Sequence, residues 1–291
     1  MAWDRVVKLF VGEDGKGLEI SGLDLSFDIR RANTPADNTA TFVIYNAKEQ
    51  TRREVLKKGN NLIFEAGYID EGTGTLFIGN ITSAVSKKQD DTWVTKVTAA
   101  SIRATNQPLK YVIFTGSYIP GTKLSTVIQE IGNAIGLVVI GATNADVELP
   151  NGWTYAGSLR GALKYCQKIL NDNDKALYID NNELVIFNTG DRDSQFSVLQ
   201  LDYTSGLLRA GDITEVNASD NKNDKDAKAK ETEKPPEKRI EFEAILLPKL
   251  QPNILVQIES ETVNGVYLVE IATFRGDNMG GTFQCKGEAV E

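Results

Sequence analysis

The sequence predicts a mainly β protein with a smaller mixed α/β part. Over Leu23–Arg30, apolar side chains alternate strictly with polar ones, which is typical of a strand with one buried face. Amphipathic helical periodicity is instead found in the middle of the chain, over Thr122–Ile135 and Leu159–Leu170. We therefore expect β structure at both ends of the chain and the mixed part between them.

Residues 1–108 are expected to form an antiparallel β domain. Its expected strands, which are separated by polar or glycine-rich turns, are Val6–Val11, Leu23–Arg30, Thr39–Asn46, Asn61–Ile69, Thr75–Ser83 and Thr92–Ile102. Ala47–Lys58 breaks this pattern because it is rich in helix formers and stops before Gly59, which can serve as a C-cap. We expect one short helix there, placed between two strands.

Residues 109–200 are expected to form a small mixed α/β domain. Ser158 can cap the helix that begins at Leu159, because its hydroxyl can accept a hydrogen bond from an amide of the first turn. Lys175–Asp180 and Glu183–Asn188 flank an Asn-Asn pair, and asparagine tolerates the positive φ that tight hairpin turns need. The sequence therefore predicts two helices and a terminal hairpin.

Residues 201–291 are expected to form a second β domain, interrupted by a charged loop at 217–239. That tract contains no large apolar residue and includes a Pro pair, so it cannot bury enough surface to offset its ordering entropy. A flexible loop or linker is expected, with an interaction segment that orders on assembly as the alternative. The β pattern then resumes in three segments, Ile254–Ser260, Val263–Phe274 and Thr282–Glu288.

Composition excludes several classes of function. The 291 residues include no histidine, which removes His-based acid–base catalysis and most transition-metal sites. The net charge of −8 disfavours nucleic acid as the main partner. No window approaches the roughly 18 apolar residues of a membrane span, and the N-terminus does not resemble a signal peptide. Cys166 and Cys285 lie in apolar segments and are expected to be buried free thiols.

The sequence contains no convincing catalytic, cofactor or metal site. Asp172-Asn173-Asp174 superficially resembles the start of a calcium loop, and Glu183 matches the final bidentate position. The glycine required at the sixth position is replaced by Leu177, and the expected hairpin occupies the same stretch. We therefore expect no catalytic residues, no cofactor-binding residues and no metal ligands.

Two surface features are candidates for protein contacts. Arg52, Arg53, Lys57 and Lys58 form a basic cluster, for which a solvated helix face is expected and contact with an acidic neighbouring subunit is the alternative. Trp153-Thr154-Tyr155 offers aromatic side chains that suit either an interface anchor or a packing role within the fold.

Several segments together resemble phage tail baseplate hub proteins, which form the central hub ring of contractile phage tails and related injection particles. The N-terminal part of this resemblance is Leu18–Asn46 followed by the helix and by Asn60–Ser83, with Gly67-Tyr68 and Phe77-Ile78-Gly79-Asn80-Ile81 as the pattern of paired strands. Ser158–Asn188 resembles the small α/β domain of such hubs, and the region from Ile240 onward resembles their second barrel. The charged tract departs from the common pattern.

The resemblance implies two tail-tube-like antiparallel β-barrels with an inserted mixed α/β domain. It also implies a homotrimer whose ring adapts the sixfold tail tube to the threefold central spike and seeds tube assembly. The implied partners are the tail tube protein or a tube initiator, the spike and the tape-measure protein. Genome DNA would pass through the lumen without sequence-specific binding, and no membrane insertion is expected.

We expect a non-enzymatic structural protein of the virion tail baseplate, assembled in the host bacterial cytoplasm. The first alternative is a peptidoglycan-degrading tail hub enzyme, although no stretch is left for a separate catalytic domain. The second alternative is a receptor- or carbohydrate-binding tail protein.

Overall fold

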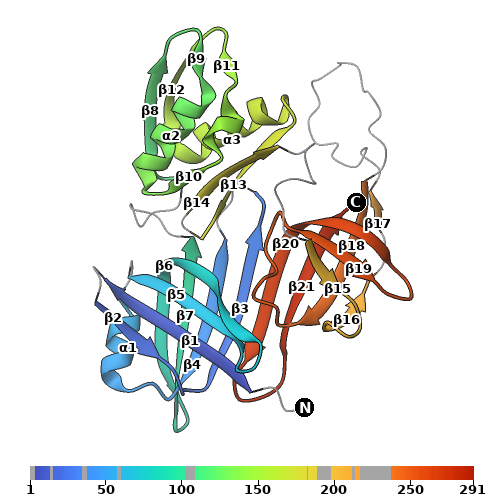
Figure 1. The fold of residues 1–291 in the computed structure, drawn as a ribbon. Helices are drawn as coiled ribbons and strands as arrows, with labels where there is room; N and C mark the ends of the chain where they lie inside the picture. Colours follow the sequence, from blue (N-terminus) through green and yellow to red (C-terminus); the bar gives the residue numbers. More distant parts are fainter. Residues whose placement is uncertain are drawn as a thin grey trace.

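The protein is mainly β with few helices, which confirms the prediction from the sequence. Its structure is a computed structural model that describes residues 4–13, 16–34, 38–57, 60–101, 109–181, 183–188, 198–211, 214–216 and 237–291. Two β halves lie side by side, and the smaller α/β part sits against one end of them (Figure 1). No helix of the described residues is both long and apolar enough to cross a bilayer.

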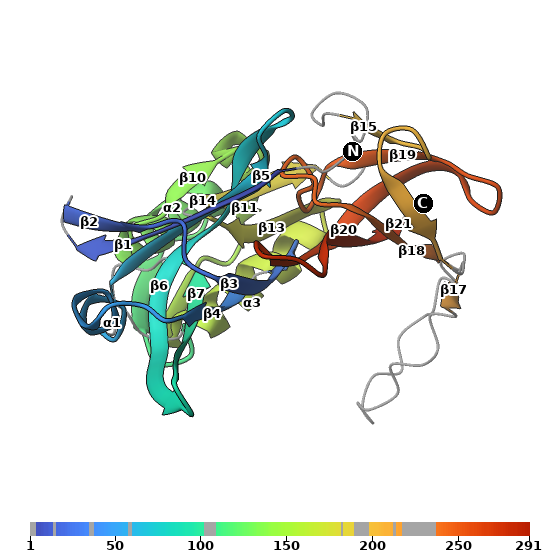
Figure 2. The same cartoon turned by 90° about the horizontal axis from the view of Figure 1, so that it is seen from below.

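The first half contains seven strands and one helix among its described residues. They are β1 (Arg5–Glu13), β2 (Lys16–Ile20), β3 (Leu25–Ala32), β4 (Thr39–Tyr45), α1 (Glu49–Val55), β5 (Asn61–Tyr68), β6 (Gly72–Gln89) and β7 (Thr92–Ser101). β3 follows the alternation of the sequence, with Leu25, Phe27 and Ile29 buried. The long strand β6 extends past the end of β5 and projects with β7 from the body of the half (Figure 2).

The α/β part agrees closely with the periodicity of the sequence. Its elements are β8 (Ile113–Tyr118), β9 (Thr122–Lys123), α2 (Leu124–Ile135), β10 (Val138–Ile140), η1 (Ala142–Ala145), β11 (Glu148–Leu149), β12 (Trp153–Ser158), α3 (Leu159–Asn171), β13 (Lys175–Asp180) and β14 (Glu183–Asn188). The Ser158 hydroxyl accepts from the Gly161 amide at 3.2 Å, so the expected cap of α3 is present. β13 and β14 form the expected antiparallel hairpin, with Asn181 at φ 45°.

The second half is built from residues C-terminal to the α/β part. Its strands are β15 (Val198–Leu201), β16 (Leu207–Ala210), β17 (Thr214–Val216), β18 (Glu237–Ile245), β19 (Leu255–Glu259), β20 (Asn264–Asp277) and β21 (Phe283–Val290). The expected loop at 217–239 is wrong for Glu237–Arg239. These residues start β18 because β17 offers them a ladder, from Val216 opposite Glu237 to Thr214 opposite Arg239. Residues 217–236 lie outside the described residues.

One strand ladder runs through both halves. The described residues give the order β16-β18-β21-β20-β3-β4-β7-β6-β5-β1-β2, and the two halves join where β20 pairs with β3. This path is open in the described part of the chain, because β2 and β16, its two end strands, do not pair with each other. Closure of each half into a tail-tube-like barrel therefore stays a prediction.

Two large hydrophobic cores underlie this arrangement, beside a small cluster of Leu255, Leu268 and Val290 in the second half. One core draws buried residues from both β halves, including Phe42, Phe64, Phe242 and Phe274. The second core lies within the α/β part and is built largely from α2, α3 and the β13–β14 hairpin. The two β halves are thus continuous in both their ladder and their core, whereas the α/β part packs its own interior.

The two β halves repeat the same strand pairing. The order β5-β6-β7-β4-β3 in the first half matches β19-β20-β21-β18-β16 in the second, with antiparallel neighbours throughout. The β6–β7 ladder shifts register between Ile81 and Ser83, and the β20–β21 ladder does so between Val269 and Ile271. This shared irregularity, a β-bulge with one extra residue, aligns Ile81 with Val269.

Buried side chains occupy matching positions when the halves are aligned in this way. The matched pairs that follow from the ladders are Phe42 with Phe242, Ala40 with Ile240, Ala99 with Ala289, Leu62 with Val256 and Phe64 with Ile258. All ten side chains are buried. The halves therefore share ladder order, a bulge and an inward-facing pattern, which is the signature of one fold present twice.

Candidate assembly surfaces

The joint between the halves is a ladder of seven residue pairs that runs from Ile271 opposite Ala32 to Asp277 opposite Ser26. On its exposed side, the Arg275 guanidinium binds the Asp28 carboxylate at 2.9 Å. On its buried side, a Cβ at Gly276 would lie 2.4 Å from the Phe27 ring, so the joint needs glycine there. Close packing and a continuous ladder hold the halves in one orientation.

The turn after β20 is fixed to the first half by hydrogen bonds. The Arg5 guanidinium donates to three carbonyls of the 277–281 turn at 2.7–2.8 Å. The Asn278 side-chain oxygen accepts from the Leu25 amide at 2.8 Å. Met279, at the tip of this turn, is 74% exposed. The turn is thus a rigid, solvent-facing corner of the joint.

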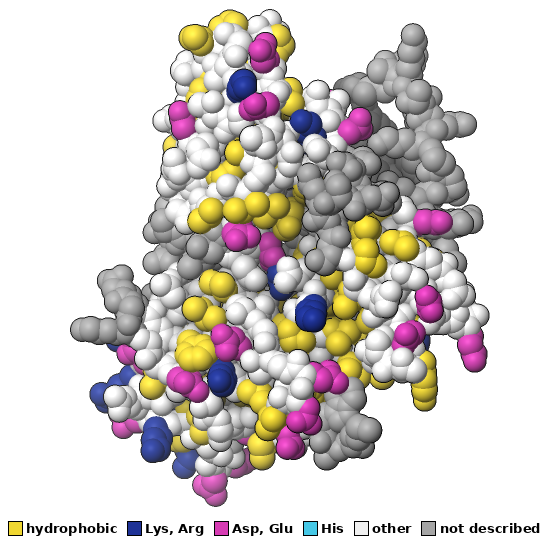
Figure 3. All heavy atoms as spheres, viewed as in Figure 1, with side chains coloured by type: hydrophobic (Ala, Val, Ile, Leu, Met, Phe, Trp, Pro, Cys, Tyr) yellow, Lys and Arg dark blue, Asp and Glu magenta, His cyan; other side chains and the backbone are white. Residues whose placement is uncertain are grey.

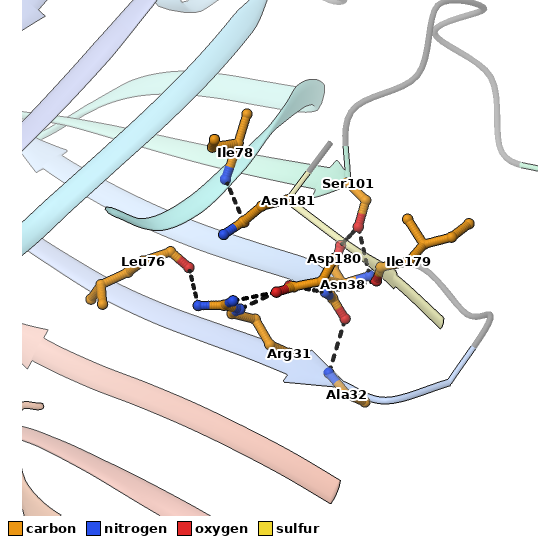
Figure 4. Close-up of polar contacts among 9 residues, drawn as sticks. All are labelled: Arg31, Ala32, Asn38, Leu76, Ile78, Ser101, Ile179, Asp180 and Asn181. Atoms are coloured by element: carbon orange, nitrogen blue, oxygen red, sulfur yellow. Dashed lines mark hydrogen bonds and ion pairs between the residues drawn. The ribbon is translucent and has the colours of Figure 1, made fainter. Parts of the chain in front are cut away.

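A buried ion pair fastens the α/β part to the first half. Arg31 continues the inward-facing row of β3 and is only 1% exposed, and its Nε and Nη2 atoms both donate to the carboxylate of Asp180 at the tip of the β13–β14 hairpin (Figure 4). Arg31 also donates to the Leu76 carbonyl at 3.4 Å. Because an uncompensated charge is costly inside a protein, each partner depends on the other.

Backbone groups around this ion pair are satisfied by two asparagines (Figure 4). Asn38 donates to the Ile179 carbonyl at 3.2 Å and accepts from the Ala32 amide at 3.0 Å. Asn181 accepts from the Ile78 amide at 3.0 Å. The Ile78 amide belongs to the part of β6 that lies before the described β7 ladder begins, and the hairpin tip supplies it with an acceptor.

The far end of β6 is a second open edge. β6 pairs with β5 only up to Asn80, whereas β7 stays paired with β6 to Gln89. One edge of residues 83–89 thus has no strand beside it among the described residues. Val85 on this segment is 47% exposed. An unpaired strand edge is a template for pairing with another chain, so this segment is a candidate contact surface.

The basic cluster expected from the sequence lies on and just after α1. Arg53 binds Glu49 at 2.5 Å, and Lys57 binds Glu54 at 2.7 Å, with exposed or partly exposed partners. Arg52 stacks on the Trp93 ring of β7 at 3.8 Å from its centroid. Lys58 lies outside the described residues. Figure 3 shows Lys and Arg side chains at the lower left, over the region of α1 in Figure 1. Local acidic partners thus offset part of this positive charge.

The aromatic segment at residues 153–155 is part of a stack on the α/β part. The Trp153 ring stacks with Tyr118, Tyr155 and Tyr165, at centroid distances of 5.9, 5.1 and 4.7 Å. Tyr118, Trp153 and Tyr155 are half-buried, and Tyr165 is 37% exposed. Packing within the fold therefore accounts for Trp153.

The remaining sequence features have structural roles. Asp172 ends α3, and Glu183 starts the second strand of the hairpin, so the calcium-like spacing is divided between two elements. Both cysteines are free and buried, and burial raises the pKa of each thiol to about 12. No group of three metal-ligating side chains occurs among the described residues.

Comparison with protein families gives a match between residues 7–219 and the family described as baseplate hub gp41. The chain belongs to the baseplate hub gp41 family. The match covers the first half, the α/β part and the beginning of the second half. It confirms the hub resemblance read from the sequence and gives the chain a role in a phage tail hub. A comparison with curated proteins gives no match.

Solved structures similar to this hub chain come from tails and from a secretion machine. A tail protein of Neisseria meningitidis MC58 is 13% identical, with a TM-score of 0.67 over 99% of this chain and 97% of its own. The 43 kDa tail protein of prophage MuSo2 from Shewanella oneidensis is 13% identical, with a TM-score of 0.65 over 99% and 98%. These likenesses show that the whole chain has the fold of such tail proteins.

A third similar structure is the E. coli c3393 protein, a component of the type VI secretion system that is structurally similar to the T4 bacteriophage tail proteins gp27 and gp5. It is 8% identical, with a TM-score of 0.59 over 92% of this chain and 73% of its own. The fold of the hub chain is thus shared between phage tails and a related injection machine.

Sequence reasoning missed the residues that join the parts of this hub. Arg31 carried a signal, because the alternation of Leu25, Phe27 and Ile29 places it on the buried face of β3. A charged residue at such a position indicates a buried partner. Its partner Asp180 lies far away in the chain, and no local pattern identifies it.

Proposed function

We propose that the chain is a structural, non-enzymatic hub that forms a homotrimeric ring of six tail-tube-like units. Such a ring would present sixfold pseudosymmetry to the tail tube, threefold symmetry to the central spike, and a surface on which tube assembly starts. The observation that supports this most strongly is the repeat within one chain, because two copies of one fold per chain and three chains give six equivalent units.

In this proposal each half closes into a barrel in the assembled ring. The partners are the tail tube protein or a tube initiator on one face and the spike on the other, with the tape-measure protein as a further neighbour. Genome DNA passes through the lumen, for which the net charge of −8 is suited because it limits binding to phosphates. Assembly takes place in the cytoplasm of the host bacterium, before the baseplate is incorporated in the virion.

Light scattering after size-exclusion chromatography tests the ring. We expect a mass of three times the 31.9 kDa chain, stable on dilution to low micromolar concentration. A species that stays monomeric across the accessible concentration range, both alone and with the spike protein added, would contradict the ring. A dimer or tetramer would contradict the symmetry match.

Two alternatives from other functional classes have their own tests. A peptidoglycan-degrading hub enzyme would give a clearing band in a zymogram at the mass of the chain. A receptor- or carbohydrate-binding tail protein would bind defined glycans on an array. We expect no band and no specific glycan binding. A positive result in either assay, carried out with the purified full chain, would replace the structural assignment.

A further inference from the structure

The repeat leaves one strand edge occupied in the second half and open in the first. In β20, the edge opposite β21 pairs first with β19 and then, after the bulge, with β3. In β6, the edge opposite β7 pairs first with β5, but after the bulge nothing lies beside it among the described strands. The far end of β6 therefore lacks the neighbour that its counterpart has.

The second half contains the counterpart of that missing neighbour. β3 is the strand that pairs with β4 on the side away from β7, and the strands that pair with β18 on the side away from β21 are β16 and β17. β3 uses its second edge to bind β20. The second edge of β16–β17 has no partner strand in the described part of the chain. The chain thus contains one complete joint, between β20 and β3. It also has two unpaired edges, on β6 and on β16–β17, that match the two sides of that joint.

We propose that the far end of β6 in one copy pairs, antiparallel, with β16 and β17 of the next copy, in the register of the β20–β3 joint along β16 and with one extra residue before β17. This contact rests on the proposed ring and names its interface. The shared bulges carry the register across: Asp277 opposite Ser26 within the chain becomes Gln89 opposite Arg209 between copies. Each ring would then alternate joints within chains and joints between chains.

Side chains at the two open edges fit this register in part. Lys87 takes the position of Arg275, whose guanidinium binds Asp28 across the complete joint, but Gly211 takes the position of Asp28, so this ion pair has no counterpart between copies. At the next position, Lys88 replaces Gly276, and Ala210 replaces the Phe27 ring that Gly276 accommodates. A large residue paired with a small one is thus kept, with the sizes exchanged between the two strands.

A second copy of the chain is the partner that this surface requires. The two open edges belong to different halves: the tip that β6 forms with β7 lies at the lower left of Figure 1, and β16 and β17 lie at its right. Contacts between two different patches run head to tail, and such contacts close into rings when the rotation per copy permits. In the proposed ring of three copies, the joint between copies would turn one unit against the next as the joint within a copy does.

Paired cysteines test this interface directly. The double variant Gln89→Cys, Arg209→Cys places two thiols opposite each other across the proposed joint. Its counterpart within the chain is the pair Asp277–Ser26, which is a non-hydrogen-bonded pair because the Asp277 amide donates to the Thr282 carbonyl on the other side of β20. Such pairs have Cα atoms about 4.5 Å apart, which suits a disulfide. We expect mild oxidation to convert the trimer into covalent dimers and closed covalent trimers on a non-reducing gel. The native thiols are buried and add no background.

Matched controls separate this proposal from the ring itself. The control variant Gln89→Cys, Thr154→Cys keeps the cysteine on β6 and moves the other to an exposed position on the α/β part, away from the proposed joint. It should give no closed covalent trimer. A trimer by light scattering without the 89–209 cross-link, in protein whose circular dichroism is unchanged, would overturn the interface and leave the ring standing. A monomer at all concentrations, without cross-linking, would overturn both.

Discussion

The two β halves share a fold but differ in what their long strands contact. In the second half, β20 is paired along both edges, first by β19 and then by β3. In the first half, the far end of β6 is paired by β7 alone among the described strands. The difference shows how a repeat can encode assembly: one joint is made within the chain, and the same joint is left open for the next copy.

The halves also differ in what covers their ends. The first half binds the α/β part through Arg31 on β3 and the Ile78 amide of β6, which contact Asp180 and Asn181 at the hairpin tip. The second half contributes its 277–281 turn to the first, held by Arg5. The first half is therefore the centre of the chain, and both other parts are fastened to it.

The largest effect is expected from breaking the shared core at matched positions. Phe42→Ala and Phe242→Ala should each lower the free energy of unfolding by about 3–5 kcal/mol, because both rings are fully buried and leave cavities. Since one core spans both halves, each variant should shift a single urea transition followed by circular dichroism. Two separate transitions, with only one of them moved by Phe242→Ala, would show that the halves unfold independently.

A smaller effect is expected from the ion pair that only the first half makes. Asp180→Ala leaves the Arg31 guanidinium buried without its counter-ion, which should cost about 3 kcal/mol. The matched control is Asp28→Ala, which removes the exposed pair with Arg275 and should cost less than about 1 kcal/mol. Urea midpoints measure both. Equal losses would mean that the docking of the α/β part does not depend on the buried pair.

The smallest effect on the folded chain, with a clear effect on assembly, is expected at the open edge of β6. Ser86→Pro removes an amide that faces this edge, so each joint between copies should lose one hydrogen bond, about 1 kcal/mol, plus a steric penalty from the ring. Sedimentation velocity over a dilution series should show dissociation at a higher concentration. Ser86→Ala keeps the amide and should assemble normally. An unchanged trimer for Ser86→Pro would place the interface elsewhere.

Local structure was largely predictable from the sequence. Alternation located β3, helical periodicity located α2 and α3, and Ser158 gave the start of α3 correctly. The hairpin of β13 and β14 followed from its Asn-Asn turn. These signals are local, since they depend on which face of a single element is buried.

Long-range structure was not predictable in the same way. The short strand β2 (Lys16–Ile20) was not recognised as an element of its own, because its pairing with β1 and not its own pattern defines it. The β20–β3 joint links residues far apart in the chain, and its register depends on partners that no local window contains. The repeat is equally hidden: Phe42 and Phe242 are identical, but Leu62 with Val256 and Phe64 with Ile258 preserve only apolar character.

Residue-resolved hydrogen exchange on the trimer tests the joint between copies most directly. The Asn278 amide, just after β20, donates to the Leu25 carbonyl, and amides alternate between the two edges of a strand. The amides of Ala272, Phe274 and Gly276 therefore also face β3. Their counterparts in β6 are Ala84, Ser86 and Lys88, whereas the intervening amides of Val85 and Lys87 face β7.

If the next copy pairs with this edge, Ala84, Ser86 and Lys88 should exchange as slowly as Val85 and Lys87 in the trimer. In the Ser86→Pro variant, diluted until its trimer dissociates, the Ala84 and Lys88 amides should exchange much faster. Fast exchange of Ala84, Ser86 and Lys88 in the intact trimer, beside protected Val85 and Lys87, would show that the edge remains open and would contradict the account.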